Sequence, residues 1–251
     1  MKRIYNIFCV TLVCSFLLYS CKKDIVVTDI GQDYFPYKVG CYVVYDVDST
    51  YYNNFYSPVL VTNTKFQLKE VIRSIYYDNQ NRPTARLERY IKHYDSLVPY
   101  NEMAWTLKNV WAENLTISTA EKVEENIRFV RLVFPVMLNQ TWNTNAQNYL
   151  TAKNFTYTLV DKPATIGGIA FDSVLQTVYT DGGNILTSKQ YHSENYARQV
   201  GLIYKQVINV QSQPSTTADS TQLQLFYATP ILQRITGGYQ YTWTVNSYGV
   251  E

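Results

Sequence analysis

The sequence contains residue types that carry enzyme chemistry, but their spacing is poor for catalysis. His93 is followed by Tyr94, Asp95 and Ser96, so the residue types of a catalytic triad lie together. Neighbouring residues of a strand point to opposite faces of the sheet, and no Gly-x-Ser-x-Gly sequence surrounds the serine. We therefore interpret His93 as an ordinary sheet residue.

The carboxylates and the metal-binding residue types give no stronger evidence of a catalytic site or a metal site. Glu121, Glu124 and Glu125 lie close enough in sequence to suggest the carboxylate pair of a glycoside hydrolase. Glu124 and Glu125 are neighbours, however, and diverge on a strand, which favours a solvated charge cluster. The two histidines, His93 and His192, are far apart, and no Cys or His pair has the spacing of metal ligands. We expect no catalytic residue, no metal ion and no cofactor.

Aromatic residues are the one population that suggests binding. Tyr51, Tyr52, Phe55 and Tyr56 lie in a polar stretch with Asn53 and Asn54. Exposed rings in such a loop can stack on sugar rings or contact a partner protein. The alternative is that these rings pack over the end of the sheet.

The N-terminus predicts export and lipid attachment. Lys2 and Arg3 precede a mostly apolar segment that ends at Leu18, which is the length of a signal-peptide core and too short for a spanning helix. Leu18-Tyr19-Ser20-Cys21 follows and resembles a bacterial lipobox, with a small residue before the cysteine. The resemblance implies cleavage before Cys21 and a thioether-linked lipid on its thiol, which would hold the protein on a membrane.

Cleavage changes the charge and the cysteine count. Loss of Lys2 and Arg3 lowers the basic residues from 22 to 20, which equals the 20 acidic residues. A neutral mature protein gives no electrostatic reason to expect nucleic-acid binding. Cys9 and Cys14 leave with the signal peptide, so Cys41 is the one cysteine without lipid and no intrachain disulfide can form. We interpret Cys41 as a buried structural thiol, with a reactive or intermolecular thiol as the alternative.

Residues 34–251 read as a single β-rich domain behind a signal peptide (1–20) and a tether (21–33). Apolar residues recur mostly with a period of two, and turn formers separate the runs. The segments 66–76 and 84–94 read as a hairpin around residues 78–83, and 115–120 reads as a further strand. About ten such segments predict a mainly β fold: a curved antiparallel meander closed as an incomplete barrel or a sandwich. Residues 221–235 read as a short helix or a loop broken at Pro230.

A faint internal repeat suggests duplicated halves near 34–133 and 134–251. Phe35-Pro36 is followed by Gly40, and Phe134-Pro135 is followed by Asn139 at the same offset. The alternative is that such residues recur at many strand starts.

Several motifs resemble those of an uncharacterised lipoprotein family of the Bacteroidetes. They are the opening Phe35-Pro36-Tyr37-Lys38-Val39-Gly40 with Tyr42 and Tyr45, the segment 124–135 with Trp142, and the segment Tyr196-Ala197-Arg198-Gln199-Val200-Gly201-Leu202-Ile203-Tyr204. Val43 stands where the family opening often has Trp. The resemblance implies an outer-membrane lipoprotein that faces the periplasm or the cell surface, and it implies no catalytic residue.

Four Asp-Ser pairs resemble O-glycosylation sites of the same bacteria, in which Asp precedes the modified Ser or Thr. The candidate serines are Ser49, Ser96, Ser173 and Ser220.

Three classes of function follow. The first is a membrane-anchored, non-enzymatic β domain of the cell envelope that binds a ligand or an envelope protein. The second is a carrier or chaperone of lipids or lipoproteins with an apolar concave face. The third is an enzyme that acts on glycans, with Glu124 or Glu125 as its catalytic group.

Overall fold

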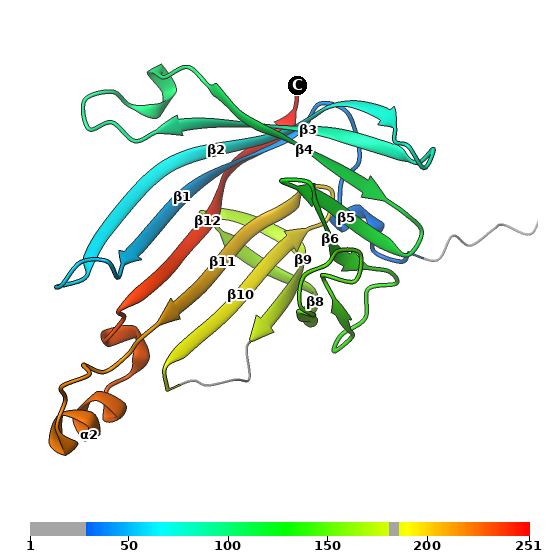
Figure 1. Cartoon of the computed structure of the whole chain (residues 1–251). Helices are drawn as coiled ribbons and strands as arrows, with labels where there is room; N and C mark the ends of the chain where they lie inside the picture. Colours follow the sequence, from blue (N-terminus) through cyan, green and yellow to red (C-terminus); the bar gives the residue numbers. More distant parts are fainter. Residues whose placement is uncertain (1–28, 181–185) are drawn as a thin grey trace, which may run out of the picture.

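The computed structural model describes residues 29–180 and 186–251, and it consists almost entirely of antiparallel strands (Figure 1). Twelve strands form one sheet in the order β6-β5-β4-β3-β2-β1-β12-β11-β10-β9-β8-β7. The strands are β1 (Cys41–Asn53), β2 (Leu60–Tyr77), β3 (Pro83–His93), β4 (Thr106–Leu115), β5 (Thr119–Glu124), β6 (Ile127–Val133), β7 (Thr141–Asn143), β8 (Asn154–Ile166), β9 (Ile169–Thr180), β10 (Ser188–Ala197), β11 (Gly201–Gln211) and β12 (Gly237–Val250). The expected mainly β meander is confirmed.

The sheet curls into a nearly closed barrel, which is one of the closures that the sequence left open. Its edges are β6 and β7, and side chains and backbone bridge the seam between them. The Val130 amide donates to the Thr144 carbonyl at 2.9 Å, and the Trp142 indole donates to the Val130 carbonyl at 3.1 Å. Backbone and side-chain hydrogen bonds therefore close the gap between the two edge strands, and they protect the edge groups from pairing with other chains.

Short helices interrupt the strands at a few places. They are η1 (Gln32–Tyr34), η2 (Tyr100–Glu102), α2 (Ser220–Ala228) and η3 (Ile231–Gln233). Helix α2 begins with a capping box in which Asp219 and Gln222 exchange side-chain and backbone bonds. It ends before Pro230, so the expected short helix broken at that proline is confirmed.

One expected strand is wrong. Residues 115–120 do not form one extended segment, because β4 ends at Leu115 and β5 begins at Thr119. The Thr116 hydroxyl accepts the amides of Ser118 and Thr119 at 3.2 and 2.8 Å and so closes a tight turn. Threonine makes this turn through its side chain, without the Gly or Pro that would have signalled it.

The two ends of the barrel differ. At one end, here called the tether end, the chain enters at Asp29 and continues into η1. Tyr34 and Phe35 are buried there, and the Tyr34 hydroxyl lies 2.6 Å from both Asp161 and Ser173. Arg198 pairs with Asp33 at 2.6 Å, so an ion pair fastens this segment over the barrel. Residues 30–33, the last part of the expected tether, thus pack against the domain.

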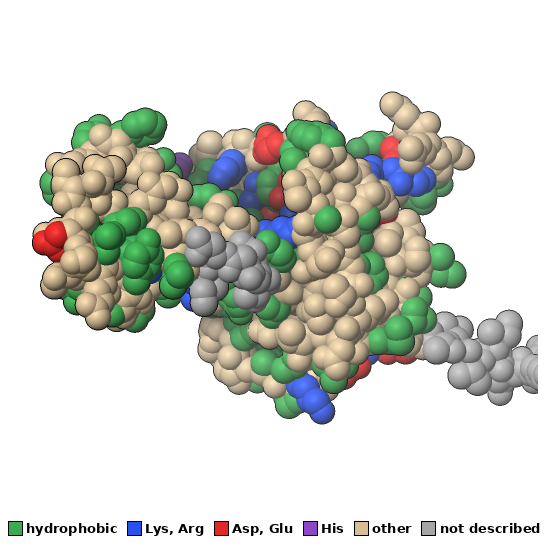
Figure 2. All heavy atoms as spheres, turned by 60° about the horizontal axis from the view of Figure 1, so that its bottom comes forward, with side chains coloured by type: hydrophobic (Ala, Val, Ile, Leu, Met, Phe, Trp, Pro, Cys, Tyr) green, Lys and Arg blue, Asp and Glu red, His purple; other side chains and the backbone are tan. Residues whose placement is uncertain are grey.

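The opposite end, here called the open end, carries the β1–β2 turn and the long β11–β12 connection with α2 (Figure 1). Figure 2 looks toward this end and shows Lys, Arg, Asp and Glu side chains gathered in a hollow between two lobes. The strand register places the β1–β2 turn and the β11–β12 connection at the same end of the barrel, since Tyr52 pairs with Gly238 and Gln211 pairs with Gly237.

The two halves of the chain, β1–β6 and β7–β12, are consecutive meanders that meet at β1 and β12. Gly40 and Asn139, the repeated positions of the sequence, both have a left-handed backbone, with φ of 89° and 66°. The duplication stays a prediction.

Candidate functional site: a charged chamber and an aromatic trough

A cluster of ionised side chains occupies the barrel interior. Its members come from seven strands, point inward and are mostly buried: Glu70 on β2, Arg89 on β3, Glu113 on β4, Lys122 and Glu124 on β5, and Glu194 on β10. Arg131 on β6, His192 on β10 and Lys205 on β11 complete it. Carboxylates and cations are equal in number, so the chamber holds charge in pairs rather than in excess.

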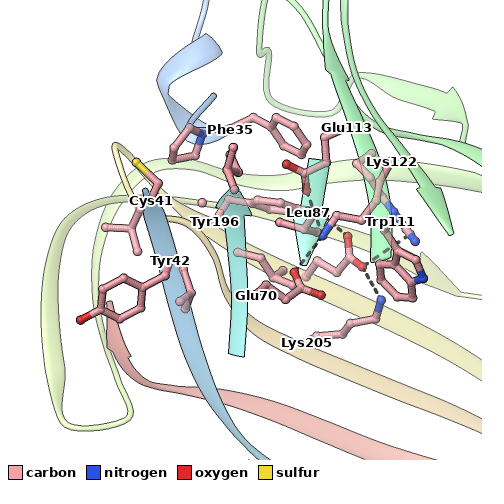
Figure 3. A pocket seen from close by; sticks show the side chains of 18 of the residues that line it. Phe35, Cys41, Tyr42, Glu70, Leu87, Trp111, Glu113, Lys122, Tyr196 and Lys205 are labelled. Atoms are coloured by element: carbon pink, nitrogen blue, oxygen red, sulfur yellow. Dashed lines mark hydrogen bonds and ion pairs between the residues drawn. The ribbon is translucent and has the colours of Figure 1, made fainter. Parts of the chain in front are cut away.

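One half of the cluster is built around Glu70. Its carboxylate pairs with Arg89 at 2.8 Å and with Lys122 at 2.9 Å. Lys122 also pairs with Glu113 at 3.1 Å, so one ammonium joins two carboxylates (Figure 3). Removing both cations from Glu70 would leave an uncompensated buried charge, so the ionised Glu70 depends on Arg89 and Lys122.

The other half is built around Glu194, which is 2% exposed. Its carboxylate lies 3.0 Å from the Lys205 ammonium and 3.0 Å from His192 Nε2, and it accepts the Tyr196 hydroxyl at 2.6 Å. Arg131 bridges to it at 3.6 Å and also pairs with Glu124. Four partners therefore hold one carboxylate ionised in the interior.

The titration of these groups follows from burial and from their partners. Burial alone would raise the pKa of Glu70, but the charges of Lys122 and Arg89 outweigh it and lower that pKa to about 2. For Glu113 burial prevails over the attraction of Lys122, and its pKa is raised. Burial lowers the pKa of His192 to about 4, so its imidazole is neutral at pH 7. The two carboxylates that share Lys122 are thus shifted in opposite directions.

A small chamber adjoins the cluster. Its volume is about 70 Å³, and its lining includes Phe35, Trp111, Glu113, Lys122 and Trp243 (Figure 3). This space is lined by apolar and ionised side chains, and it has room for a few water molecules rather than for an acyl chain or a sugar ring. A larger ligand must therefore bind outside the chamber.

Two tryptophan rings, Trp111 and Trp243, line the chamber beside its cations. The Arg89 guanidinium lies 3.4 Å from the Trp111 ring centroid and 5.5 Å from that of Trp243. Lys205 lies 5.1 Å from the Trp243 ring. The cations thus meet both carboxylates and aromatic faces, which fixes their positions.

Above the chamber, cross-strand pairing defines rows of side chains on the inner face. Residues directly opposite each other on paired strands share a face. The row at the level of the cluster consists of Phe66, Val47, Trp243, Lys205, Glu194 and Thr177. The next row toward the open end consists of Thr64, Ser49, Tyr241, Val207, His192 and Tyr179. The outermost row consists of Thr62, Tyr51, Tyr239, Asn209 and Gln190. We call the two outer rows the trough.

An aromatic ladder runs along β12 through these rows. Tyr239 and Tyr241 lie with ring centroids 6.1 Å apart and planes inclined by 11°, and Tyr241 lies 6.2 Å from Trp243. Exposure falls along the ladder, from 39% at Tyr239 to 9% at Trp243. The ladder therefore leads from solvent at the open end to the charged cluster.

The four aromatics singled out in the sequence do not act as one loop. Tyr51 lies on the inner face opposite Tyr239 and joins the trough. Tyr52 lies on the outer face, where its hydroxyl accepts the Gln240 amide at 3.0 Å. Phe55 and Tyr56 lie in the β1–β2 turn and are exposed by 90% and 57%. The polar stretch thus contributes one ring to the trough and two to the rim of the open end.

The other candidates of the sequence lie as follows. Ser96 and Ser220 are exposed, Ser49 is half-buried in the trough, and Ser173 bonds to Tyr34 and Asp161. Glycosylation of these serines stays a prediction, and Cys21 lies outside the described residues. Cys41 is free and half-buried, less enclosed than expected, because β1 begins at that residue.

Glu124 and Glu125 diverge, as the sequence predicts, but the expected solvated cluster is wrong for Glu121 and Glu124. Glu121 is buried and pairs with Arg128 at 2.6 Å, because the curled sheet brings cations of β6 against both carboxylates. Glu124 enters the cluster, whereas Glu125 is exposed and accepts the Asn109 amide and the Trp111 indole. His93 is exposed at the end of β3, with its ring 6.4 Å from Phe66. Within residues 29–180 and 186–251, no group of three or more His, Cys, Asp or Glu is arranged to hold a metal ion.

Sequence reasoning missed the charged cluster. One signal was present: on β3, Arg89 shares a face with Ala85, Leu87 and Ile91, so a cation stands on an otherwise apolar face. Its partners could not be identified in the same way, because Glu70 and Lys122 come from other strands.

Comparison with known proteins gives two structural matches. No protein-family model matches the chain, and a search of curated proteins finds no match. A protein of Bacteroides fragilis, described as exported and as having a YmcC-like fold, matches with a TM-score of 0.41 and 8% identity over 86% of this chain and 98% of that one. A protein of Parabacteroides distasonis, described as a lipoprotein, matches with a TM-score of 0.34 and 9% identity over the same shares.

Both matches come from the Bacteroidetes, the group whose lipoproteins the sequence motifs resemble. At these identities the likeness concerns the fold alone. None of the helices in the described part of the chain has the length and hydropathy of a membrane span.

Proposed function

We propose that the protein is a lipid-anchored, non-enzymatic binding protein of the cell envelope that receives a saccharide in the trough at the open end of its barrel. The observation that carries the proposal is the aromatic ladder of Tyr239, Tyr241 and Trp243. Sugar rings stack on aromatic faces, and their hydroxyls bond to polar side chains beside them.

The composition of the trough supports this ligand class. Thr62, Asn209 and Gln190 share the outermost row with Tyr51 and Tyr239, so hydrogen-bonding groups flank the rings. All of these side chains are at least partly exposed, and a ligand can reach them without unfolding a strand.

The position of the trough fits a protein held by its N-terminus. The lipobox sequence predicts a lipid on Cys21, and the described chain enters the domain at the tether end. The trough lies at the other end of strands that are 13 and 14 residues long. It would thus face away from the bilayer that holds the lipid, in the periplasm or outside the cell.

The ion pairs that the carboxylates form favour a binding function over catalysis. Hydrolysis of a glycosidic bond needs one carboxylic acid and one free carboxylate on either side of the bond. Glu70, Glu124 and Glu194 are each held by cations, and the chamber beside them is too small for a sugar ring. Glu113 and Glu70 have the opposed pKa shifts of an acid–base pair, but Lys122 lies between them.

The lipid-carrier alternative needs an apolar cavity that holds an acyl chain, and the small volume of the chamber and the ionised side chains in its lining do not favour it. Burying an acyl chain beside Glu113, Lys122 and Lys205 would displace water from ionised groups without replacing its hydrogen bonds.

A second candidate is an envelope protein that contacts the rim of the open end. Helix α2 has no buried residue, and Leu225 on it is 69% exposed. Phe55, in the nearby β1–β2 turn, is also exposed. Photo-crosslinking from position 55 in intact cells would test this: a discrete adduct supports the contact, and its absence at several positions along the rim contradicts it.

Calorimetric titration of the full chain in detergent tests the leading proposal. The probes are neutral and acidic tetrasaccharides, built from glucose, galactose and their uronic acids. We expect at least one to bind, and Tyr239→Ala and Tyr241→Ala each to weaken its binding by about tenfold, which corresponds to the 1–3 kcal/mol of an aromatic contact.

Tyr248→Ala is the matched control. Tyr248 lies on the same strand near the tether end and is 41% exposed, against 39% for Tyr239. Equal losses in the three variants, or binding of none of the tetrasaccharides, would contradict the proposal.

A further inference from the structure

Two lysines near the trough differ from the cations of the buried cluster. Arg89, Lys122, Arg131 and Lys205 each have a carboxylate within 4.0 Å. Lys108 and Lys153 have none among the described residues. Each is instead placed over an aromatic ring of the inner face.

Lys108 owes its position to a β-bulge. Arg89 pairs with Asn109 and Tyr90 pairs with Leu107, so Lys108 is the extra residue on β4. Bulges redirect a side chain relative to the regular pleat. The Lys108 ammonium lies 5.4 Å from the centroid of Phe66, which belongs to the row at the level of the cluster.

Lys153 lies on the other side of the barrel interior, just before β8. Its ammonium is 4.4 Å from the centroid of Tyr179 and 5.9 Å from that of Phe155. Tyr179 lies on β9 in the row of Tyr241 and His192, so Lys153 reaches the edge of the trough through its contact with this ring.

Phe66 lies on β2 and Tyr179 lies on β9, and these are the first and last strands that the rows cross. The strands between them are β1, β12, β11 and β10, so five inter-strand spacings separate β2 from β9. At about 4.8 Å each, they span about 24 Å along the curved sheet, and curvature brings the two sides closer together. A ligand of several sugar units is long enough to lie between the lysines.

The surroundings of each lysine lower its pKa and, within the described part of the chain, leave its charge without a partner carboxylate. Lys108 is exposed, but partial desolvation and the nearby charge of Arg89 prevail over the opposing charge of Glu125 and lower its pKa. Burial and the charges of Arg131 and Lys205 prevail over the opposing charge of Glu194 and lower the pKa of Lys153. A carboxylate or sulfate brought in by a ligand would relieve both of these repulsions.

We propose that the ligand of the trough is an acidic saccharide whose carboxylates or sulfates pair with Lys108 and Lys153. This inference rests on the proposed function, because it specifies the class of sugar that the aromatic ladder receives. The rings supply stacking that is common to all sugars, and the two lysines select those that carry negative charge.

The test is a comparison of matched tetrasaccharides by calorimetry on the full chain. The α-1,4-linked galacturonate tetramer should bind at least tenfold more tightly than the neutral galactose tetramer of the same linkage. Lys108→Gln and Lys153→Gln should each reduce that preference about fivefold, and the double variant should abolish it while the neutral sugar binds as before.

Controls separate charge from folding. Lys108→Arg and Lys153→Arg should retain most of the preference. Lys65→Gln should leave it unchanged, because Lys65 is an exposed lysine of β2 that pairs with Asp48 on the other face of the sheet. Circular dichroism checks that every variant is folded.

The outcomes distinguish the two proposals. Equal affinity for the acidic and the neutral tetramer, with loss in Tyr239→Ala, would overturn the inference and leave the proposed function standing. Binding of neither tetramer, and of none of the glucose and glucuronate counterparts, would overturn both. A preference that survives the double variant would overturn the role of these lysines.

Discussion

Single ionised side chains determine how the barrel interior is held together. Glu70 and Glu113 share Lys122, yet burial and charge shift them in opposite directions. For Glu70 the cations prevail over burial, so its ionised form stabilises the fold. For Glu113 burial prevails, so its ionised form is a cost at neutral pH.

The isosteric variants Glu70→Gln and Glu113→Gln should therefore differ in stability at pH 7. A pKa of about 2, against 4.5 for an unperturbed glutamate, corresponds to about 3 kcal/mol, and we expect Glu70→Gln to lose roughly that much unfolding free energy. Glu113→Gln should change it by less than about 1 kcal/mol or increase it. Urea denaturation of both variants measures this, and equal losses would contradict the assignment.

The contribution of Glu70 should also depend on pH. Its folded-state pKa is lowered to about 2, so its stabilising effect is fully present above the unfolded pKa of 4.5 and is lost as pH falls through 2. The stability difference between the wild type and Glu70→Gln should accordingly shrink between pH 5 and pH 2 in denaturation series. A difference that stays constant over this range would refute the linkage.

The strands were largely predictable from local pattern, and their ends were not. Alternation of apolar and polar residues indicated the hairpin of β2 and β3 around residues 78–83, and the pairing of Tyr77 with Pro83 confirms it. Strand β5 was misplaced because Thr116 closes its turn through a side-chain bond. The β8–β9 hairpin depends on contacts with β12, far away in sequence.

Two adjacent glycines of that hairpin offer a matched pair of variants. Gly167 and Gly168 have φ of 61° and 77°, so Ala at either position is strained to a similar degree, by about 1 kcal/mol. A Cβ at Gly167 would also meet the Val245 carbonyl oxygen at 2.0 Å, whereas one at Gly168 meets nothing within 4 Å. Thermal unfolding should show Gly167→Ala to be less stable than Gly168→Ala by about 2 kcal/mol.

Equal stability of these two variants would mean that the hairpin does not pack on β12 as described.

At the scale of the whole molecule, barrel closure creates a site that no single segment contains. The trough takes Tyr51 from β1, Tyr239 from β12 and Gln190 from β10, and these residues are far apart in sequence. A period-two pattern predicts which residues share a face of one strand, but not which faces meet across a closed sheet. Composition showed many tyrosines, and the register of β12 shows which of them line the interior.

The anchor is predicted from sequence alone and can be tested on the whole protein. Cys21→Ala should move the protein from the membrane fraction to the soluble fraction of its native host, because the lipid thioether cannot form. Mass spectrometry of the wild type should show a chain that begins at Cys21 and carries acyl groups. Cys41→Ala is the control and should remain with the membrane; membrane retention of Cys21→Ala would contradict the anchor.

The most direct test of the trough as a saccharide site is a crystal structure of the full chain with the galacturonate tetramer bound. We expect sugar density on the inner face of the barrel at the open end, with a ring stacked on Tyr239 or Tyr241 and carboxylates within salt-bridge distance of Lys108 and Lys153. Density at the rim, on the outer face or at the tether end, with the trough empty, would contradict the account.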